Sequence, residues 1–175
     1  EKGRLFEDYG FLERSHNYIQ WLFPLIDKSP NNPNAILNRD EVELFKSYTM
    51  VQENLVKSLT TMMDFYGATL VTDPEITITH GEEKVGVLGE TKTKQRLTNM
   101  NDNPHNRLRV TRILSSLKLL GREDLQKVVY DYFNYMVSND PYGIEWKDSY
   151  KESHKNYWKP TIETVTAAPA RPKLV

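Results

Sequence analysis

The sequence predicts an all-α fold, a compact multi-helix bundle around two central helices with a small β-hairpin insertion. Two apolar stripes at helical spacing favour this fold, one over residues 38–66 and one over 104–120. Two further amphipathic stretches, 122–138 and 145–158, would pack on the same core. We expect a single domain over residues 1–160, followed by a flexible C-terminal tail over 161–175.

The helix predicted at 104–120 carries two different faces. Asn103 can cap it, Pro104 suits its first turn, and Gly121 can end it in a left-handed conformation. The apolar stripe that would face the core consists of Val110, Ile113, Leu114 and Leu117. A second face carries hydrogen-bond donors at i, i+4, i+7 and i+11, namely His105, Arg109, Arg112 and Ser116. We refer to these four residues as the donor row.

The segment before the first central helix contains a short helix and a loop. Ser15 can cap the short helix and Pro24 stops it, because the residue before a proline is driven out of the helical region. The polar edge of this short helix would carry His16, Asn17, Gln20 and Trp21. Residues 27–37 are predicted to be a loop from their proline and asparagine content. Asn38 and Glu41 then form a capping box that starts one long helix, which Gly67 ends.

The remaining elements lie between and after the two central helices. Alternating residues over 75–89 predict a two-stranded hairpin that turns at residues 80–83. A short basic helix is expected over 91–100, and its charges would mostly face solvent. The stripe over 122–138 ends before Pro141, and Pro160 closes the final helix.

Composition limits the chemistry that the chain can perform. The absence of cysteine excludes disulfides and thiolate zinc sites, and no apolar run is long enough to cross a bilayer. The four histidines are scattered, and no phosphate-binding loop or nucleophile elbow is present. We therefore predict no catalytic residue, no metal site, no cofactor and no enzymatic activity. The formal net charge of −1 also disfavours binding to nucleic acid through phosphate contacts.

The candidate ligand-binding residues are His16, Gln20, Trp21, His105, Arg109 and Arg112. The helix start beside the donor row offers free N–H groups and a partial positive charge, which suits a carboxylate or a phosphate. The competing interpretation is structural, with Arg109 and Arg112 paired to acidic residues of neighbouring helices. In the same way, Trp21 could belong to the core and Gln20 could hydrogen-bond a loop carbonyl.

Four stretches of the sequence, in order, are similar to one known family. They are HNYIQWLFPL at 16–25, RDEVELFK at 39–46, LVKSLTTMMDFYGATL at 55–70 and HNRLRVTRILSSLKLLG at 105–121. Together they resemble the conserved region of the opioid growth factor receptor family over most of residues 9–126. Residues 72–94 have no clear counterpart, and the long repeat-rich tail of vertebrate members is absent from the sequence.

This resemblance implies a function that the residue patterns do not specify. Vertebrate members of the family are described as intracellular receptors for an enkephalin-type opioid peptide that restrain cell proliferation. We therefore expect a non-enzymatic module that binds a peptide or protein and has a growth-regulatory receptor role. Its expected location is intracellular, either cytoplasmic or nuclear and perinuclear. The alternative is a nucleic-acid or phosphate binder that uses Arg107, Arg109 and Arg112 with the basic residues at 92–96.

Overall fold

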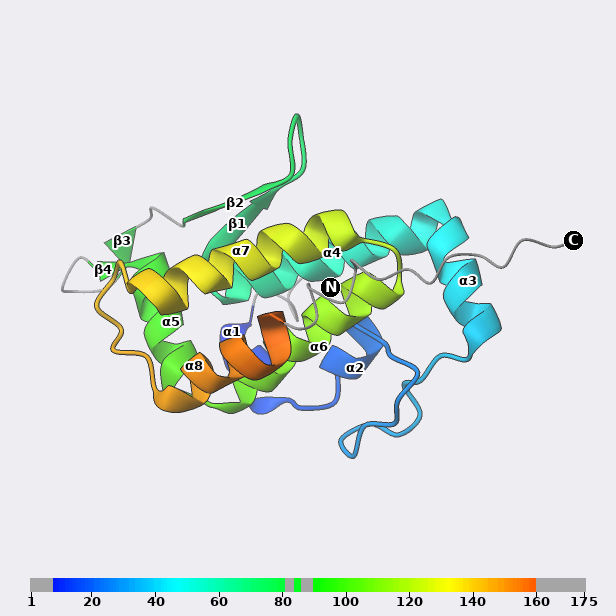
Figure 1. Cartoon of the computed structure of the whole chain (residues 1–175), viewed down its shortest axis with the longest axis horizontal. Coiled ribbons are helices and arrows are strands. Elements are labelled where there is room, and N and C mark those ends of the chain that lie inside the picture. Colours follow the sequence, from blue (N-terminus) through cyan, green and yellow to red (C-terminus); the bar gives the residue numbers. More distant parts are fainter. Residues whose placement is uncertain (1–7, 81–83, 86–89, 160–175) are drawn as a thin grey trace, which may run out of the picture.

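The computed structural model describes residues 8–80, 84–85 and 90–159, and these residues form a mostly helical bundle (Figure 1). The helices are α1 (Tyr9–Arg14), α2 (Ile19–Leu22), α3 (Arg39–Ser47), α4 (Thr49–Phe65), α5 (Lys92–Asp102), α6 (His105–Leu119), α7 (Glu123–Asn139) and α8 (Asp148–Ser153), with a π-helical turn η2 (His154–Trp158) after α8. The strands are β1 (Ala68–Val71), β2 (Thr77–His80), β3 (Lys84–Val85) and β4 (Glu90–Thr91). This architecture confirms the predicted all-α class. The predicted tail lies outside the described residues.

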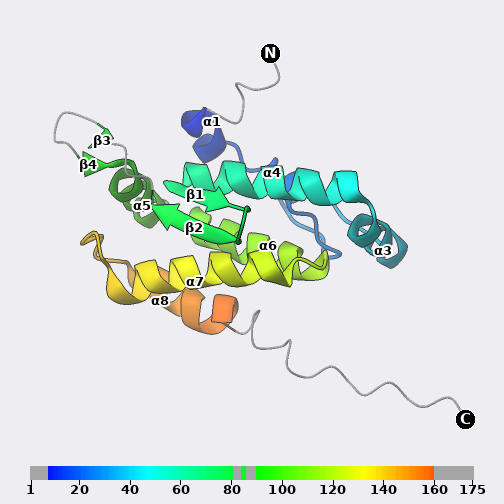
Figure 2. The same cartoon turned by 90° about the horizontal axis from the view of Figure 1, so that it is seen from above.

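The core lies between α4, α6 and α7, which run along the long axis of the molecule (Figure 1). Seen from above, the hairpin of β1 and β2 lies between α4 and α7 over the top of the core (Figure 2). The stripe predicted on α6 is fully buried, and it consists of Val110, Ile113, Leu114 and Leu117. The complete burial of this stripe makes α6 a central helix of the bundle.

The prediction of a single long helix over 38–66 is wrong, because the helix is interrupted at Tyr48. Tyr48 adopts an extended backbone (φ −87°, ψ 111°), so that α3 ends at Ser47 and α4 begins at Thr49. The capping box at Asn38 and Glu41 is present as predicted. The break is tolerated because the Gln52 amide donates to the carbonyl of Phe45 (2.9 Å) near the end of α3. Periodicity alone missed the break because the apolar spacing continues through it.

The predicted hairpin pairs different strands from those expected. β2 pairs with β1 in an antiparallel register that places His80 opposite Ala68, and the turn lies between residues 71 and 77. The strands on either side of residues 80–83 do not pair with each other as predicted, since β2 pairs with β1 and β3 with β4. The predicted turn itself falls mostly on residues 81–83, which lie outside the described chain. Gly67 (φ 79°) reverses the chain after α4, and this reversal lets Ala68 and Leu70 bury against the core. A second short pair joins β3 to β4.

Three predicted helix starts also differ from the structure. Ser15 is the C-cap of α1, and Tyr18 precedes α2. Asn103 does not cap α6, because its side chain donates to the carbonyl of Asn99 (2.8 Å). The final helix begins at Asp148 and not at residue 145.

The predicted end of α6 agrees with the structure. Gly121 has φ 74°, and the Arg122 N–H donates to the carbonyl of Leu117 (2.8 Å), which is the bond expected after a left-handed C-terminal glycine. In the parts of the chain that the structure describes, no helix is both long enough and apolar enough to cross a bilayer.

Candidate functional site

The donor row of α6 faces the N-terminal segment and binds its backbone. Arg109 Nη2 donates to the carbonyl of Ser15 (2.8 Å). One turn later Arg112 Nε donates to the carbonyl of Phe23 (2.9 Å), and Ser116 Oγ donates to that of Pro24 (2.9 Å). These carbonyls belong to irregular chain around the short helix α2, where a ladder of backbone bonds cannot satisfy them. The same-face placement predicted from sequence is therefore correct. The expected acidic partners of Arg109 and Arg112 are replaced, however, by backbone carbonyls of the N-terminal segment.

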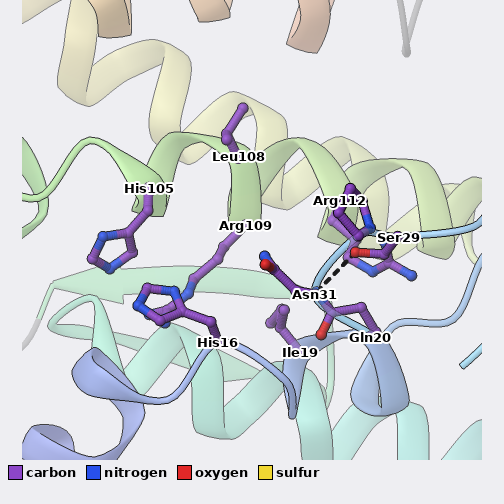
Figure 3. Close-up of a pocket in the computed structure, with 10 residues that line it drawn as sticks. His16, Ile19, Gln20, Ser29, Asn31, His105, Leu108, Arg109 and Arg112 are labelled. Carbon is purple, nitrogen blue, oxygen red and sulfur yellow. Dashed lines mark hydrogen bonds between the residues drawn. The ribbon is translucent and has the colours of Figure 1, made fainter. Parts of the chain in front are cut away.

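Above these contacts, a pocket of about 350 Å³ opens between α6 and the segment 16–31 (Figure 3). Its lining residues are His16, Ile19, Gln20, Ser29, Pro30, Asn31, His105, Leu108, Arg109 and Arg112. Five of the six candidate residues predicted from sequence thus line one pocket. The sixth, Trp21, does not.

Trp21 lies on a different surface. Its side chain is 63% exposed, so that the core interpretation of Trp21 is wrong. It lines a separate groove of about 100 Å³ between α2 and the α3–α4 corner, beside Phe45 and Leu55. A ligand in the larger pocket would therefore not need Trp21.

Arg109 is a buried structural residue of the pocket floor. Its side chain is 4% exposed, and Nη1 donates to Asn106 Oδ1 (3.0 Å). Nη2 reaches the carbonyls of Glu13 (3.3 Å) and Ser15, and the guanidinium lies 5.4 Å from the ring centroid of Tyr18. Both terminal nitrogens are thus occupied by contacts that hold the N-terminal segment on α6.

Arg112 is only partly satisfied by the fold. Its Nε bonds the carbonyl of Phe23, but Nη2 is buried and has no hydrogen-bond partner among the described residues. Burial lowers the pKa of this guanidinium, and no carboxylate nearby opposes the shift. A buried donor without a partner is costly. Arg112 as a whole is half-buried and lines the pocket, so a ligand there would meet the accessible part of its guanidinium.

Two histidines and a glutamate lie together at the other end of the pocket. The rings of His16 and His105 meet edge to face at 4.9 Å, and His105 Nε2 lies 2.5 Å from Glu13 Oε1. Burial and the positive charge of Arg109 lower the pKa of His105, while Glu13 opposes them. Glu13 also accepts from the Asn99 amide (2.6 Å). Within the described ranges, no group of three or more ligating side chains could hold a metal ion.

Gln20 joins the short helix to the loop that closes the pocket. The side chain is 3% exposed and meets Ser29 Oγ at 3.2 Å (Figure 3). We orient its amide so that the nitrogen donates to the carbonyls of His16 (3.1 Å) and Asn17 (3.2 Å) and the oxygen accepts from Ser29. This agrees with the expectation that Gln20 bonds a loop carbonyl.

Sequence reasoning missed several residues of this site. Ser29 and Asn31 lie on the 27–37 loop, which was interpreted only as a connection, although such loops often carry polar binding groups. Leu108 is 56% exposed on α6 and forms part of the pocket wall. A solvent-facing leucine between two arginines on one helix was the available signal for it.

The basic residues of the alternative function mostly contact their own molecule. Arg107 Nη1 donates to Ser153 Oγ (3.1 Å) at α8. Arg96 donates to the carbonyl of Phe65 (2.6 Å), with its guanidinium 4.7 Å from the ring centroid of Tyr9, and Lys92 pairs with Asp64. The expectation that residues 92–96 form a solvated basic face is thus wrong for Lys92 and Arg96.

The chain is similar to known proteins over the same region that forms this fold. The family model described as the opioid growth factor receptor (OGFr) conserved region matches residues 3–167. The human opioid growth factor receptor is 39% identical over 128 residues, which are 73% of this chain and 17% of that protein. The opioid growth factor receptor-like protein 1 of Xenopus tropicalis is 32% identical over 126 residues, which are 72% of this chain and 23% of that protein.

The chain therefore spans about a fifth of the length of the curated relatives it matches. No solved structure matches the chain significantly. The family match and the identities agree with the four sequence stretches that indicated the relationship, all of which lie within the matched region. The chain belongs to the opioid growth factor receptor conserved-region family.

Proposed function

We propose that this domain is a non-enzymatic module that binds a peptide or protein in the pocket between α6 and residues 16–31. The observation that supports this function best is the pocket lining, in which apolar residues lie beside the half-buried guanidinium of Arg112 and no residue is acidic. Ligand pockets of proteins combine mostly apolar walls with a few fixed polar groups, and about 350 Å³ lies near the lower end of their usual size. The ligand-binding residues in this proposal are His16, Gln20, His105 and Arg112, and Arg109 holds the pocket floor in place.

Family membership supports a receptor role for the domain. The relatives are named opioid growth factor receptors, and a receptor of a growth factor must bind a ligand. The proposed growth-regulatory role, and a location in the cytoplasm or at the nucleus, rest on this membership alone. Fluorescence microscopy of the tagged full-length protein tests the location directly.

The nucleic-acid alternative has less support. Binding to the phosphate backbone of a nucleic acid requires Lys and Arg side chains gathered on one exposed face of the protein. Arg109 is buried, and Arg107 and Arg96 each contact a partner in their own molecule. We therefore favour the peptide-binding function.

Affinity selection from a synthetic library of random octapeptides tests this proposal. The domain is immobilised, and retained peptides are identified by mass spectrometry. A Leu108→Trp variant narrows the pocket without touching a hydrogen bond, and Trp21→Ser serves as the matched control on the separate surface. We expect wild type and Trp21→Ser to retain the same peptides, and Leu108→Trp to lose most of them.

Two results would contradict the proposal. One is that no peptide is retained by the wild type above a blank surface. The other is that Trp21→Ser loses the retained peptides while Leu108→Trp keeps them, which would transfer the binding function to the Trp21 groove. Melting curves of both variants confirm that each is folded.

A further inference from the structure

We propose that the group which anchors the ligand is a carboxylate, bound by Arg112 next to an apolar side chain of the same ligand. This inference rests on the proposed function and adds the chemical class of the ligand. It also divides the donor row into a structural residue, Arg109, and a ligand-binding residue, Arg112.

The Arg112 guanidinium is held in position before any ligand binds. Its Nε bond to the carbonyl of Phe23 fixes one edge of the plane, while the buried Nη2 has no partner in the described chain. A planar guanidinium fixed in this way offers its remaining N–H groups in a set direction, and carboxylates match that geometry. Nη2 itself is buried, so the ligand carboxylate would meet the accessible part of the half-buried guanidinium, which lines the pocket.

The charges around the pocket also favour an anion. None of its lining residues is acidic, whereas Arg109, Arg112 and the two histidines are cationic or can become so. The nearby carboxylate of Glu13 is already engaged by Asn99 and by the contact with His105. A carboxylate in the pocket would therefore meet positive potential without a competing anion at Arg112.

The size and walls of the pocket restrict what can carry that carboxylate. A volume of about 350 Å³ admits one or two residues and not a long folded segment. Leu108 from α6 and Ile19 from α2 bring apolar side chains to the lining from two different elements, which suits an apolar side chain beside the charged group (Figure 3). Two sources share this chemistry, namely the C-terminal carboxylate of a peptide and an Asp or Glu side chain next to an apolar residue.

Matched peptide sets test the inference. N-acetylated tetrapeptides with randomised apolar residues are prepared with a terminal carboxylate, with a terminal amide, and with a terminal amide plus one internal Asp or Glu. Retention on the immobilised domain is compared for wild type, Arg112→Gln, Leu108→Glu and Leu108→Gln. We expect a carboxylate-bearing set to be retained about tenfold or more above the neutral amide set, since a charge-assisted bond contributes at least this much.

The variants connect that preference to Arg112. Arg112→Gln keeps an amide donor for Phe23 but removes the charge, so the preference should fall to near unity while the protein stays folded. Leu108 is exposed and makes no hydrogen bond through its side chain, so Leu108→Glu should weaken retention by repulsion compared with its neutral match Leu108→Gln. The source is the chain terminus if the first set is preferred, and an acidic side chain if the third is.

Three outcomes would overturn the inference. Equal retention of neutral and carboxylate sets by the wild type would leave the peptide-binding function standing but remove the carboxylate anchor. A preference that survives in folded Arg112→Gln would assign the anchor elsewhere. Binding of inorganic phosphate with no retention of any peptide would refute both the carboxylate and the peptide-binding function.

Discussion

Replacement of Arg109 by alanine should destabilise the domain severely. The side chain is 4% exposed, and its terminal nitrogens make bonds of 2.8 and 3.0 Å to Ser15 and Asn106, besides a longer one to Glu13. Bonds to a charged donor each contribute roughly 1.5–3 kcal/mol, so the two short ones contribute about 3–6 kcal/mol. Removal of the buried cation also removes the cost of desolvating its charge, which offsets part of this loss. The net decrease in the unfolding free energy should therefore be about 3 kcal/mol.

Urea denaturation followed by circular dichroism measures this loss. For a chain of this size, a loss of about 3 kcal/mol corresponds to a melting temperature lower by roughly 6–12 °C. The matched control is Arg107→Ala on the same helix, which removes one bond to Ser153 (3.1 Å). This side chain is only half-buried, so solvent screens its charge and the loss should be about 1 kcal/mol. The reasoning is refuted if Arg109→Ala lowers the unfolding free energy no more than Arg107→Ala does, with the dependence of that free energy on urea concentration unchanged.

Three further predictions concern other sites. Tyr66 is fully buried and its hydroxyl has no partner among the described residues, so Tyr66→Phe should raise the unfolding free energy by about 1 kcal/mol, and a lower denaturation midpoint would count against this. Gly67→Ala should lower the unfolding free energy by about 3 kcal/mol, because φ is 79° and the new Cβ would lie 2.8 Å from the Thr93 Cα. A urea denaturation midpoint within error of that of the wild type would refute the clash. Burial and Arg109 lower the pKa of His105, so the unfolded state binds more protons and stability should fall as pH drops below about 6.5. Melting at pH 7.5 and 5.5 should show a smaller decrease for His105→Gln than for wild type, and equal decreases would contradict the assignment.

The sequence predicted the fold where one pattern dominated the local energetics. The α6 stripe and the left-handed turn at Gly121 follow from helical spacing and from a residue type that tolerates positive φ, and both are present. The breaks were harder to predict. Tyr48 interrupts a regular apolar spacing because Gln52 can satisfy a freed carbonyl, and no local rule anticipates a bond of that kind.

The site was predictable in part for the same reason. His105, Arg109 and Arg112 lie on one helix, so their spacing alone placed them on one face. What that face meets depends on tertiary packing, which brings the chain at 13–31 across α6. Trp21 illustrates the limit of arguments from residue type, since tryptophan is usually well buried but Trp21 lies on the surface.

The structure separates two roles that the sequence left together in the donor row. Arg109 and Ser116 bond backbone carbonyls that would otherwise be unsatisfied, and this fixes the N-terminal segment on the bundle. Arg112 shares this task through Nε, but the rest of its half-buried guanidinium lines the pocket, where no residue is acidic. One row of donors can thereby both build the wall of a pocket and supply its anchor.

The most direct test of this division is an NMR titration that follows the side-chain Nε–H signals of the two arginines. The ¹⁵N-labelled domain is titrated with the carboxylate-bearing peptide that is retained most strongly. Our account predicts a saturable shift of the Arg112 signal, with that of Arg109 nearly unchanged because both its terminal nitrogens are bound within the protein. Shifts confined to residues around Trp21, with Arg112 unmoved, would contradict the account.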